Sequence, residues 1–254
     1  MKLFRATLAA SLVCVLPAQA ADVHSLLAAQ QQRVRSADFR AVGRLVRVDA
    51  AGARSSYPIT IKAHWFPGVL RVLVEIPSPA AASAHVLLEM RPDGQSTIRI
   101  AHPGDKTAAA FPFSNWSDGP LGPGFSYEDF LDAEYFWPGQ TSLGPTRLGA
   151  RDCDVVKSTP GTTDRTHYAE VKSWLDHGIG FPVYVEKTLK DGTVKEFTYM
   201  GLRQNGGVWS AGQVEVKVRG QGGSTLLVVE RGSTRANLNA DDFEPAKVLR
   251  FQDR

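Results

Sequence analysis

The alternation of apolar and polar residues predicts antiparallel strands over most of the chain. Between Tyr57 and Trp65 every second residue is apolar, which is typical of a strand with one buried face. The same pattern recurs in three later runs, residues 70–76, 86–90 and 98–100. Turn-forming Pro-Gly and Pro-Asp-Gly sequences at 67–68 and 92–94 lie between the runs. This half of the chain is therefore predicted to be a meander of consecutive strands.

The strand pattern resumes after Gly149. Six further runs are predicted as strands: residues 151–158, 166–175, 181–189, 193–203, 207–219 and 224–231. Asp191-Gly192, Asn205-Gly206 and the glycine-rich residues 220–223 supply the turns. We expect about ten or eleven strands in total. Because strand twist curls a sheet of this size, its concave face holds either the protein's own side chains or a ligand, and alternation leaves both open.

Helices are predicted to be few and short. Asp22 is placed to cap a first helix, in which Val23, Leu26, Leu27, Gln30 and Val34 fall near one face. The proline- and glycine-rich residues 103–124 predict a long surface loop. A second helix is expected to start after this loop, with Ser126 and Asp129 as a capping box and Phe125 packed on Phe130. Pro138 is expected to end it.

The first 20 residues have the features of a secretory signal peptide. Lys2 and Arg5 precede an apolar run from Ala6 to Leu16, and Ala18-Gln19-Ala20 follows, so cleavage is predicted near Ala20. The apolar run is shorter than the roughly 20 residues of a membrane span. Residues 21–254 are then predicted to form a single domain in the periplasm.

Composition narrows the function classes. Loss of Lys2 and Arg5 leaves 27 basic against 26 acidic residues, a net charge of about +1. This balance lacks the basic stripe that nucleic-acid binding needs, so no nucleic-acid partner is expected. Of the two cysteines only Cys153 remains after cleavage, which excludes an internal disulfide in the mature chain.

A search for catalytic or metal-binding residues finds no specific signal. The six histidines, His24, His64, His85, His102, His167 and His177, show no zinc-site spacing, so no metal is expected. Cys153 lies in a predicted strand and is interpreted as a small buried hydrophobe. The acids Glu128, Asp129, Asp132 and Glu134 could supply an acid and a base, but helix capping and a solvated face explain them with fewer assumptions. We expect no cofactor, no catalytic residues and no enzymatic activity.

Four segments are distinctive: Phe125-Ser-Tyr-Glu-Asp-Phe130, Tyr168-Ala-Glu-Val171 with Trp174-Leu-Asp176, Gly192-Thr-Val-Lys-Glu-Phe197, and Thr225-Leu-Leu-Val-Val229 leading to Asn237 and Phe243. In their order and spacing they resemble the outer-membrane lipoprotein-sorting family, the LolA/LolB-like proteins, and in particular a divergent branch. The first helix and Phe39-Arg-Ala-Val-Gly43 are also similar. None of these segments is a catalytic signature, so they identify a fold rather than an activity.

The resemblance implies a mainly β fold of α+β type. Its curled antiparallel sheet would form an unclosed half-barrel of about eleven strands, with short helices as a lid. An apolar cavity would take up acyl chains of lipoproteins or lipids. We predict that its ligand-binding residues are Ile59, Ile61, Trp65, Val72, Val74, Val86, Leu88, Val183, Val185, Tyr199 and Val216, with Phe130, Leu131 and Trp137 in the lid.

The favoured hypothesis is a monomeric periplasmic carrier in lipoprotein sorting or lipid transport. The resemblance implies an inner-membrane transporter and an outer-membrane acceptor as partners. The arginine that holds the lid in the family could align with Arg40, Arg44, Arg47 or Arg71. One alternative is an envelope sensor that binds lipid or lipoprotein and signals to a membrane partner. Another is an enzyme on an apolar substrate that uses Cys153 or the acids at 128–134.

Overall fold

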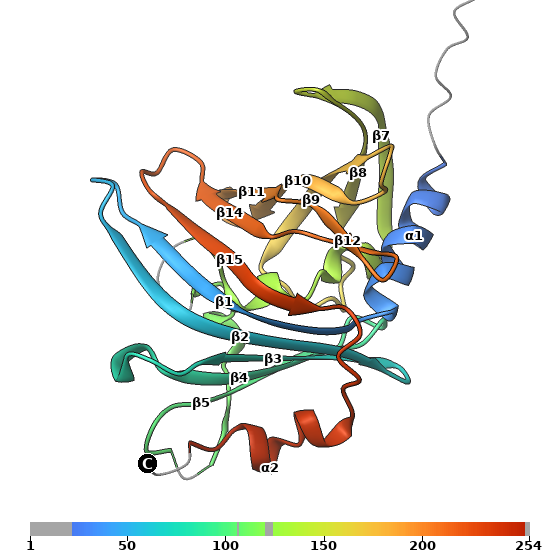
Figure 1. Ribbon diagram of the computed structural model, residues 1–254. Coiled ribbons are helices and arrows are strands. Elements are labelled where there is room, and N and C mark those ends of the chain that lie inside the picture. The colour runs from blue at the N-terminus through green and yellow to red at the C-terminus, as the bar shows by residue number, and fades with distance from the viewer. Residues whose placement is uncertain (1–21, 106, 120–123, 252–254) are drawn as a thin grey trace, which may run out of the picture.

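A curled antiparallel sheet of 13 strands forms the body of the molecule (Figure 1). The computed structural model describes residues 22–105, 107–119 and 124–251. The strands are β1 (Asp38–Val48), β2 (Arg54–Phe66), β3 (Val69–Ile76), β4 (Ala84–Met90), β5 (Ser96–Ala101), β6 (Ala109–Ala110), β7 (Gly139–Leu148), β8 (Arg151–Thr159), β9 (Tyr168–Asp176), β10 (Pro182–Leu189), β11 (Val194–Met200), β12 (Arg203–Asn205), β13 (Val208–Ser210), β14 (Gln213–Val218) and β15 (Ser224–Ser233). Strands β12 and β13 form a separate hairpin. The predicted signal peptide lies outside the described residues and stays a prediction.

The strand order explains why the sheet is an unclosed half-barrel. It runs β6-β5-β4-β3-β2-β1-β15-β14-β11-β10-β9-β8-β7, so the two edge strands, β6 and β7, do not pair with each other. Two meanders are joined where β1 pairs with β15. Because twist accumulates over so many strands, the sheet curls and its two halves face one another across the interior. The predicted fold class is confirmed.

The predicted hairpins of the first meander are present. Strand β2 turns through Pro67-Gly68 into β3, and β4 turns through residues 91–95 into β5. Gly68 and Gly94 have φ values of 78° and 83°, which glycine adopts without strain. Alternate side chains of β2 and β3 therefore reach the concave face, as the sequence pattern indicates.

The described residues form 15 strands, more than the predicted ten or eleven, because β6 and β7 were missed and the run predicted at 193–203 extends from β11 into β12. In β7, Gly144 and Pro145 interrupt the alternation of apolar and polar residues, and a bulge lies between Ser142 and Gly144. Proline is tolerated here because β7 is an edge strand. The run predicted at 207–219 is also two strands, β13 and β14, separated by Ala211 and Gly212.

A bulge in β1 requires glycine at position 43. The register between β1 and β15 shifts between Val42 and Gly43. A Cβ atom at Gly43 would collide with the backbone carbonyl oxygen of Val228. The absence of a side chain therefore allows the two meanders to come together at this junction.

Short helices cover the open side and one outer face of the sheet (Figure 1). They are α1 (Val23–Arg35), α2 (Pro245–Val248) and the 3₁₀ helices η1 (Ala80–Ala82), η2 (Phe113–Asn115), η3 (Tyr127–Phe130), η4 (Ala133–Phe136) and η5 (Ala240–Phe243). Helix α1 buries Leu27, Gln30 and Val34, which lie on its predicted inner face. Asp22 is at its N-cap, but its side chain makes no capping hydrogen bond.

The predicted second helix is two 3₁₀ turns, η3 and η4, separated by Asp132 in the left-handed conformation with φ 47°. The predicted capping box of Ser126 and Asp129 is present, and the rings of Phe125 and Phe130 lie 4.8 Å apart. The segment of residues 125–137 crosses the concave side of the sheet and is here called the lid segment.

Two apolar clusters stabilise the fold. The larger fills the concave side and includes side chains from β1–β5, the lid segment and β8–β11. The smaller lies on the convex side, where Leu238, Phe243 and Leu249 of the C-terminal segment pack on Leu73 and Leu87. The predicted surface loop at 103–124 also contributes to the larger cluster, because Trp116 is buried there and donates from its ring N–H to the carbonyl of Phe111.

Candidate functional site

A partly open cavity of about 260 Å³ lies between the concave face of the sheet, α1 and the lid segment. Apolar side chains make up most of its wall. They come from β1 (Phe39), β2 (Ile61, Ala63), β3 (Leu70, Val72), the lid segment (Phe125, Phe130, Leu131), β11 (Phe197, Tyr199), β13 (Val208, Trp209), β14 (Val214) and β15 (Leu227, Val229), with Val34, Ala37, Phe181 and Ala211. An apolar site with few polar groups is typical of ligand pockets.

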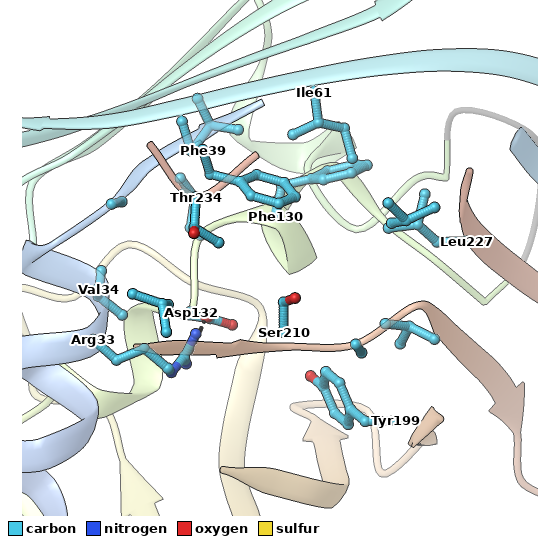
Figure 2. Close-up of a pocket in the computed structure, with 18 of the residues that line it drawn as sticks. Arg33, Val34, Phe39, Ile61, Phe130, Asp132, Tyr199, Ser210, Leu227 and Thr234 are labelled. Carbon is cyan, nitrogen blue, oxygen red and sulfur yellow. Dashed lines mark hydrogen bonds and ion pairs between the residues drawn. The ribbon is translucent and has the colours of Figure 1, made fainter. Parts of the chain in front are cut away.

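Five of the predicted site residues line this cavity. They are Ile61, Val72 and Tyr199 of the sheet and Phe130 and Leu131 of the lid segment. Figure 2 shows Ile61 and Phe130 near one another on one wall, with Tyr199 on another. Ligand binding by these residues stays a prediction, but the structure places them around one space.

The other predicted residues do not line the cavity. Most are packed in the larger apolar cluster: Ile59, Val74, Val86, Leu88, Val185, Val216 and Trp137. Trp65 is half-buried and stacks on Phe136 with ring centroids 5.7 Å apart. Val183 is buried at a register irregularity between Pro182 and Tyr184. The concave face is therefore largely filled by the protein's own side chains, and two hollows remain. One is the cavity near α1, and the other, of about 210 Å³, is lined by Val216 with Val218 and Gly124.

Two parts of the cavity wall were missed from the sequence. Helix α1 contributes Arg33 and Val34, and the β12–β13 hairpin with the following residue contributes Val208, Trp209 and Ala211. Val34 falls on the predicted buried face of the helix, so the sequence pattern could have placed it at the cavity. The hairpin could not be placed there from the sequence, because its strands are three residues long and show no extended alternation of apolar and polar residues.

Arg33 connects α1 to the lid segment. Its Nη2 donates to Oδ2 of Asp132 at 2.9 Å, and its Nε donates to Oε1 of Gln30 at 3.2 Å. Figure 2 shows this pair at one side of the cavity. Burial lowers the pKa of Arg33, but Asp132 raises it above its ordinary value, so the guanidinium stays charged. Arg33 is not among the four arginines considered from the resemblance.

The acidic cluster of the lid segment is not a solvated face. Glu128, Asp129 and Glu134 are all buried, which contradicts that interpretation. Nζ of Lys187 lies 3.3 Å from Glu134 and 3.6 Å from Asp129, and Nζ of Lys195 lies 3.5 Å from Asp129. The lysines belong to β10 and β11, so the ion pairs fasten the lid segment to the sheet.

The charges in this cluster stabilise one another. Burial raises the pKa of Asp129, but Lys195, Lys187 and a hydrogen bond from Tyr168 lower it below its ordinary value. Burial lowers the pKa of Lys187, but Glu134 and Asp129 raise it above its ordinary value. The hydroxyl of Tyr168 donates to Asp129 at 2.6 Å. Asp129, Glu134, Lys187 and Lys195 therefore each have a partner of opposite sign, whereas Oε1 of the buried Glu128 makes no hydrogen bond within the described residues and lies 3.5 Å from Nδ1 of His167.

Two of the acids considered for catalysis, Asp129 and Asp132, line the cavity, and each is engaged in an ion pair. Cys153 is buried in β8 and does not line it, and burial raises the pKa of its thiol above the ordinary value. Among the described residues, no three His, Cys, Asp or Glu side chains come together to hold a metal ion. None of the helices in the described part of the chain has the length and apolarity needed to cross a membrane.

Three solved structures from bacteria share this fold. A domain of Vibrio parahaemolyticus described as outer-membrane lipoprotein-sorting is 20% identical, with a TM-score of 0.79, over 90% of this chain and 100% of that chain. A DUF1329 family protein of Desulfovibrio piger is 14% identical, with a TM-score of 0.78, over 89% and 98%. A LolA superfamily protein of Nitrosomonas europaea is 16% identical, with a TM-score of 0.64, over 89% and 98%.

These likenesses show that the chain has the LolA-like half-barrel fold that the sequence predicted. An apolar cavity lies under its lid segment. A family model described as "Uncharacterized protein" matches residues 71–250, and the chain belongs to that family. No curated protein matches the sequence.

Proposed function

We propose that this protein is a periplasmic carrier that shields acyl chains of lipoproteins or lipids from water. The observation that carries the proposal is the apolar cavity between the sheet, α1 and the lid segment. Burial of acyl methylenes contributes roughly 0.8 kcal/mol each, so a short length of chain gives useful affinity without covalent chemistry. The shared fold with a lipoprotein-sorting domain supports the same role.

In this role the protein would be exported to the periplasm and would transfer its cargo between the two membranes. The signal peptide would be removed near Ala20, and the mature chain would receive cargo at the inner membrane and release it at an outer-membrane acceptor. The half-barrel itself would act as a monomer and as a binding protein rather than an enzyme. Edman sequencing of the periplasmic protein should begin at Ala21.

Native mass spectrometry with lipid extraction tests the carrier function. The mature protein purified from the periplasm should contain an acyl-chain compound in stoichiometric amount. Ala63→Phe fills part of the cavity and should abolish this occupancy, because Ala63 lines the cavity wall. Ala109→Phe is the matched control, since Ala109 is exposed on the edge strand β6.

The outcomes separate the hypotheses. A protein that is empty and takes up neither added fatty acid nor lipopeptide would contradict the proposal. Transfer of bound cargo to acceptor vesicles supports a carrier. Occupancy without transfer, combined with cargo-dependent binding to a membrane protein, would instead indicate the sensor.

A further inference from the structure

The cavity has a polar end and an apolar end. Figure 2 shows Arg33 and Asp132 together at one end, and Ile61 and Leu227 at the other. Val34 lies beside Arg33, and Phe39 and Phe130 lie between the two ends. A ligand that fills this space therefore matches it best when it has one polar terminus and an apolar body.

The polar end has hydrogen-bond donors that are not used within the part of the protein that the structure describes. Arg33 uses one Nη2 bond to Asp132 and one Nε bond to Gln30, and a guanidinium has five N–H groups. Within the described part of the chain, the hydroxyls of Tyr199 and Ser210 make no hydrogen bond. Figure 2 shows the Tyr199 hydroxyl directed toward the side where Arg33 and Ser210 lie. Burial and Asp132 raise the pKa of Tyr199 well above its ordinary value, so it remains a donor.

The carboxylates nearby already have partners. Asp38 accepts from the backbone N–H groups of Asn237 and Leu238 at 2.8 and 2.9 Å. Asp129 accepts from Tyr168 and is paired with Lys195. Asp132 accepts from Arg33 through Oδ2. The remaining N–H groups of Arg33 and the hydroxyls of Tyr199 and Ser210 can therefore donate to a ligand at this end, which suits a terminus rich in acceptor oxygens.

The volume limits the number of chains. Pockets that hold drug-sized ligands have about 300 to 1,000 Å³, and this cavity has about 260 Å³. The space suits one acyl chain and is too small for the several chains of a lipidated protein. Packed side chains such as Val74 and Leu88 fill the middle of the concave face and are fully buried. A second hollow of about 210 Å³ is lined by Val216 and Val218 and by the polar residues Arg47, Asp49 and Gln221.

We infer that the cargo is a fatty acid, which is a single acyl chain that ends in a carboxylate; this inference rests on the proposed carrier function. The carboxylate accepts hydrogen bonds from Arg33, Tyr199 and Ser210. The chain runs from this end toward Ile61 and Leu227. Asp132 holds one nitrogen of Arg33 and thereby orients the guanidinium toward the carboxylate.

Calorimetric titration of the mature protein tests this inference. The probes are laurate, dodecanol and dodecyltrimethylammonium, each below its aggregation concentration, together with a triacylated lipopeptide. Laurate should bind at least about tenfold more tightly than dodecanol, because charge-assisted hydrogen bonds are the stronger ones. The cationic compound should bind most weakly of the three single-chain probes.

Variants localise the effect to the polar end. Tyr199→Phe removes one hydroxyl and should weaken laurate about tenfold while dodecanol changes little. Arg33→Gln should do the same, and Tyr199→Phe keeps the test valid if loss of Arg33 loosens α1. Arg35→Gln is the matched control on the same helix, because Arg35 is exposed and does not line the cavity.

Each outcome bears on one of the two proposals. Equal affinity for laurate and dodecanol, or tight lipopeptide binding without laurate binding, would overturn the fatty-acid inference and leave the carrier function standing. If laurate, dodecanol and the lipopeptide all fail to bind, the carrier function itself fails.

Discussion

Nη2 of Arg33 lies 2.9 Å from Oδ2 of Asp132, and this ion pair joins α1 to the lid segment. The two side chains are 23% and 33% exposed, so solvent screens the pair less than it screens a surface pair. Gln31 adds a second link from the helix, because its Nε2 donates to the carbonyl of Tyr135 at 2.9 Å. The ion pair between Arg33 and Asp132 therefore helps to hold the helix over the cavity.

The first prediction concerns this ion pair. Asp132→Asn should lower the free energy of unfolding by about 1 kcal/mol and speed amide hydrogen exchange in residues 23–35. Asparagine is chosen because it tolerates the positive φ of position 132. Asp22→Asn on the same helix is the control, since its side chain makes no capping hydrogen bond. Unchanged exchange in the Asp132→Asn variant would contradict the role of the pair.

The second prediction concerns the buried ion pairs under the lid segment. Lys187→Met should lower the free energy of unfolding by about 3 to 5 kcal/mol in urea titrations, because Glu134 loses its partner while it remains buried. Adding Glu134→Gln should restore part of the loss. The control is Lys217→Met, whose ammonium pairs with Glu215 on the surface and whose removal should cost less than about 1 kcal/mol.

The third prediction is an acid dependence of stability that Asp129 contributes. Its pKa is lower in the folded chain than its ordinary value near 4, so the unfolded chain binds more protons in the interval between them. This contribution is complete above about pH 4 and is lost as the pH falls through the folded pKa.

Urea titrations between pH 2 and 6 measure this dependence. Asp129→Asn should give a shallower fall in the free energy of unfolding below pH 4 than the wild type gives. Glu244→Gln removes one exposed carboxylate and is the control. An identical slope in the wild type and in Asp129→Asn would exclude the contribution.

The fourth prediction concerns the C-terminal segment on the convex face. Phe243 is fully buried and its ring lies 5.6 Å from that of Phe66. Phe243→Ala should lower the free energy of unfolding by about 3 to 5 kcal/mol, since it leaves a cavity between this segment and β3. Phe251→Ala should cost less, because Phe251 is only half-buried. Equal losses in both variants would show that this packing is not specific.

Much of the sheet could be predicted from local patterns. The alternation from Tyr57 to Trp65 and the glycines at turns specify where strands begin and which side chains share a face. Strand β7 was not predicted, because Gly144 and Pro145 break that alternation. The capping box of Ser126 and Asp129 was readable because its members are three residues apart.

The site depended on contacts between distant residues. Ile61 and Ile59 lie on the same face of β2, yet only Ile61 lines the cavity, because the position of the lid segment and α1 decides where that face is hollow. The alternation of apolar and polar residues indicates which side chains share a face of the strand, but it does not indicate which other elements cover that face.

The amino-acid sequence by itself determined the antiparallel strands and the first helix, because these follow from patterns within single strands, turns and helices, and the half-barrel was what the resemblance to the LolA/LolB-like family implied. Only the tertiary structure decided that the acids of the lid segment are buried. Asp129 meets Lys195 and Lys187 from strands more than 50 residues later, and no local pattern reports such a pairing. The same holds for Arg33 and Asp132, whose contact exists only because folding brings α1 over the cavity.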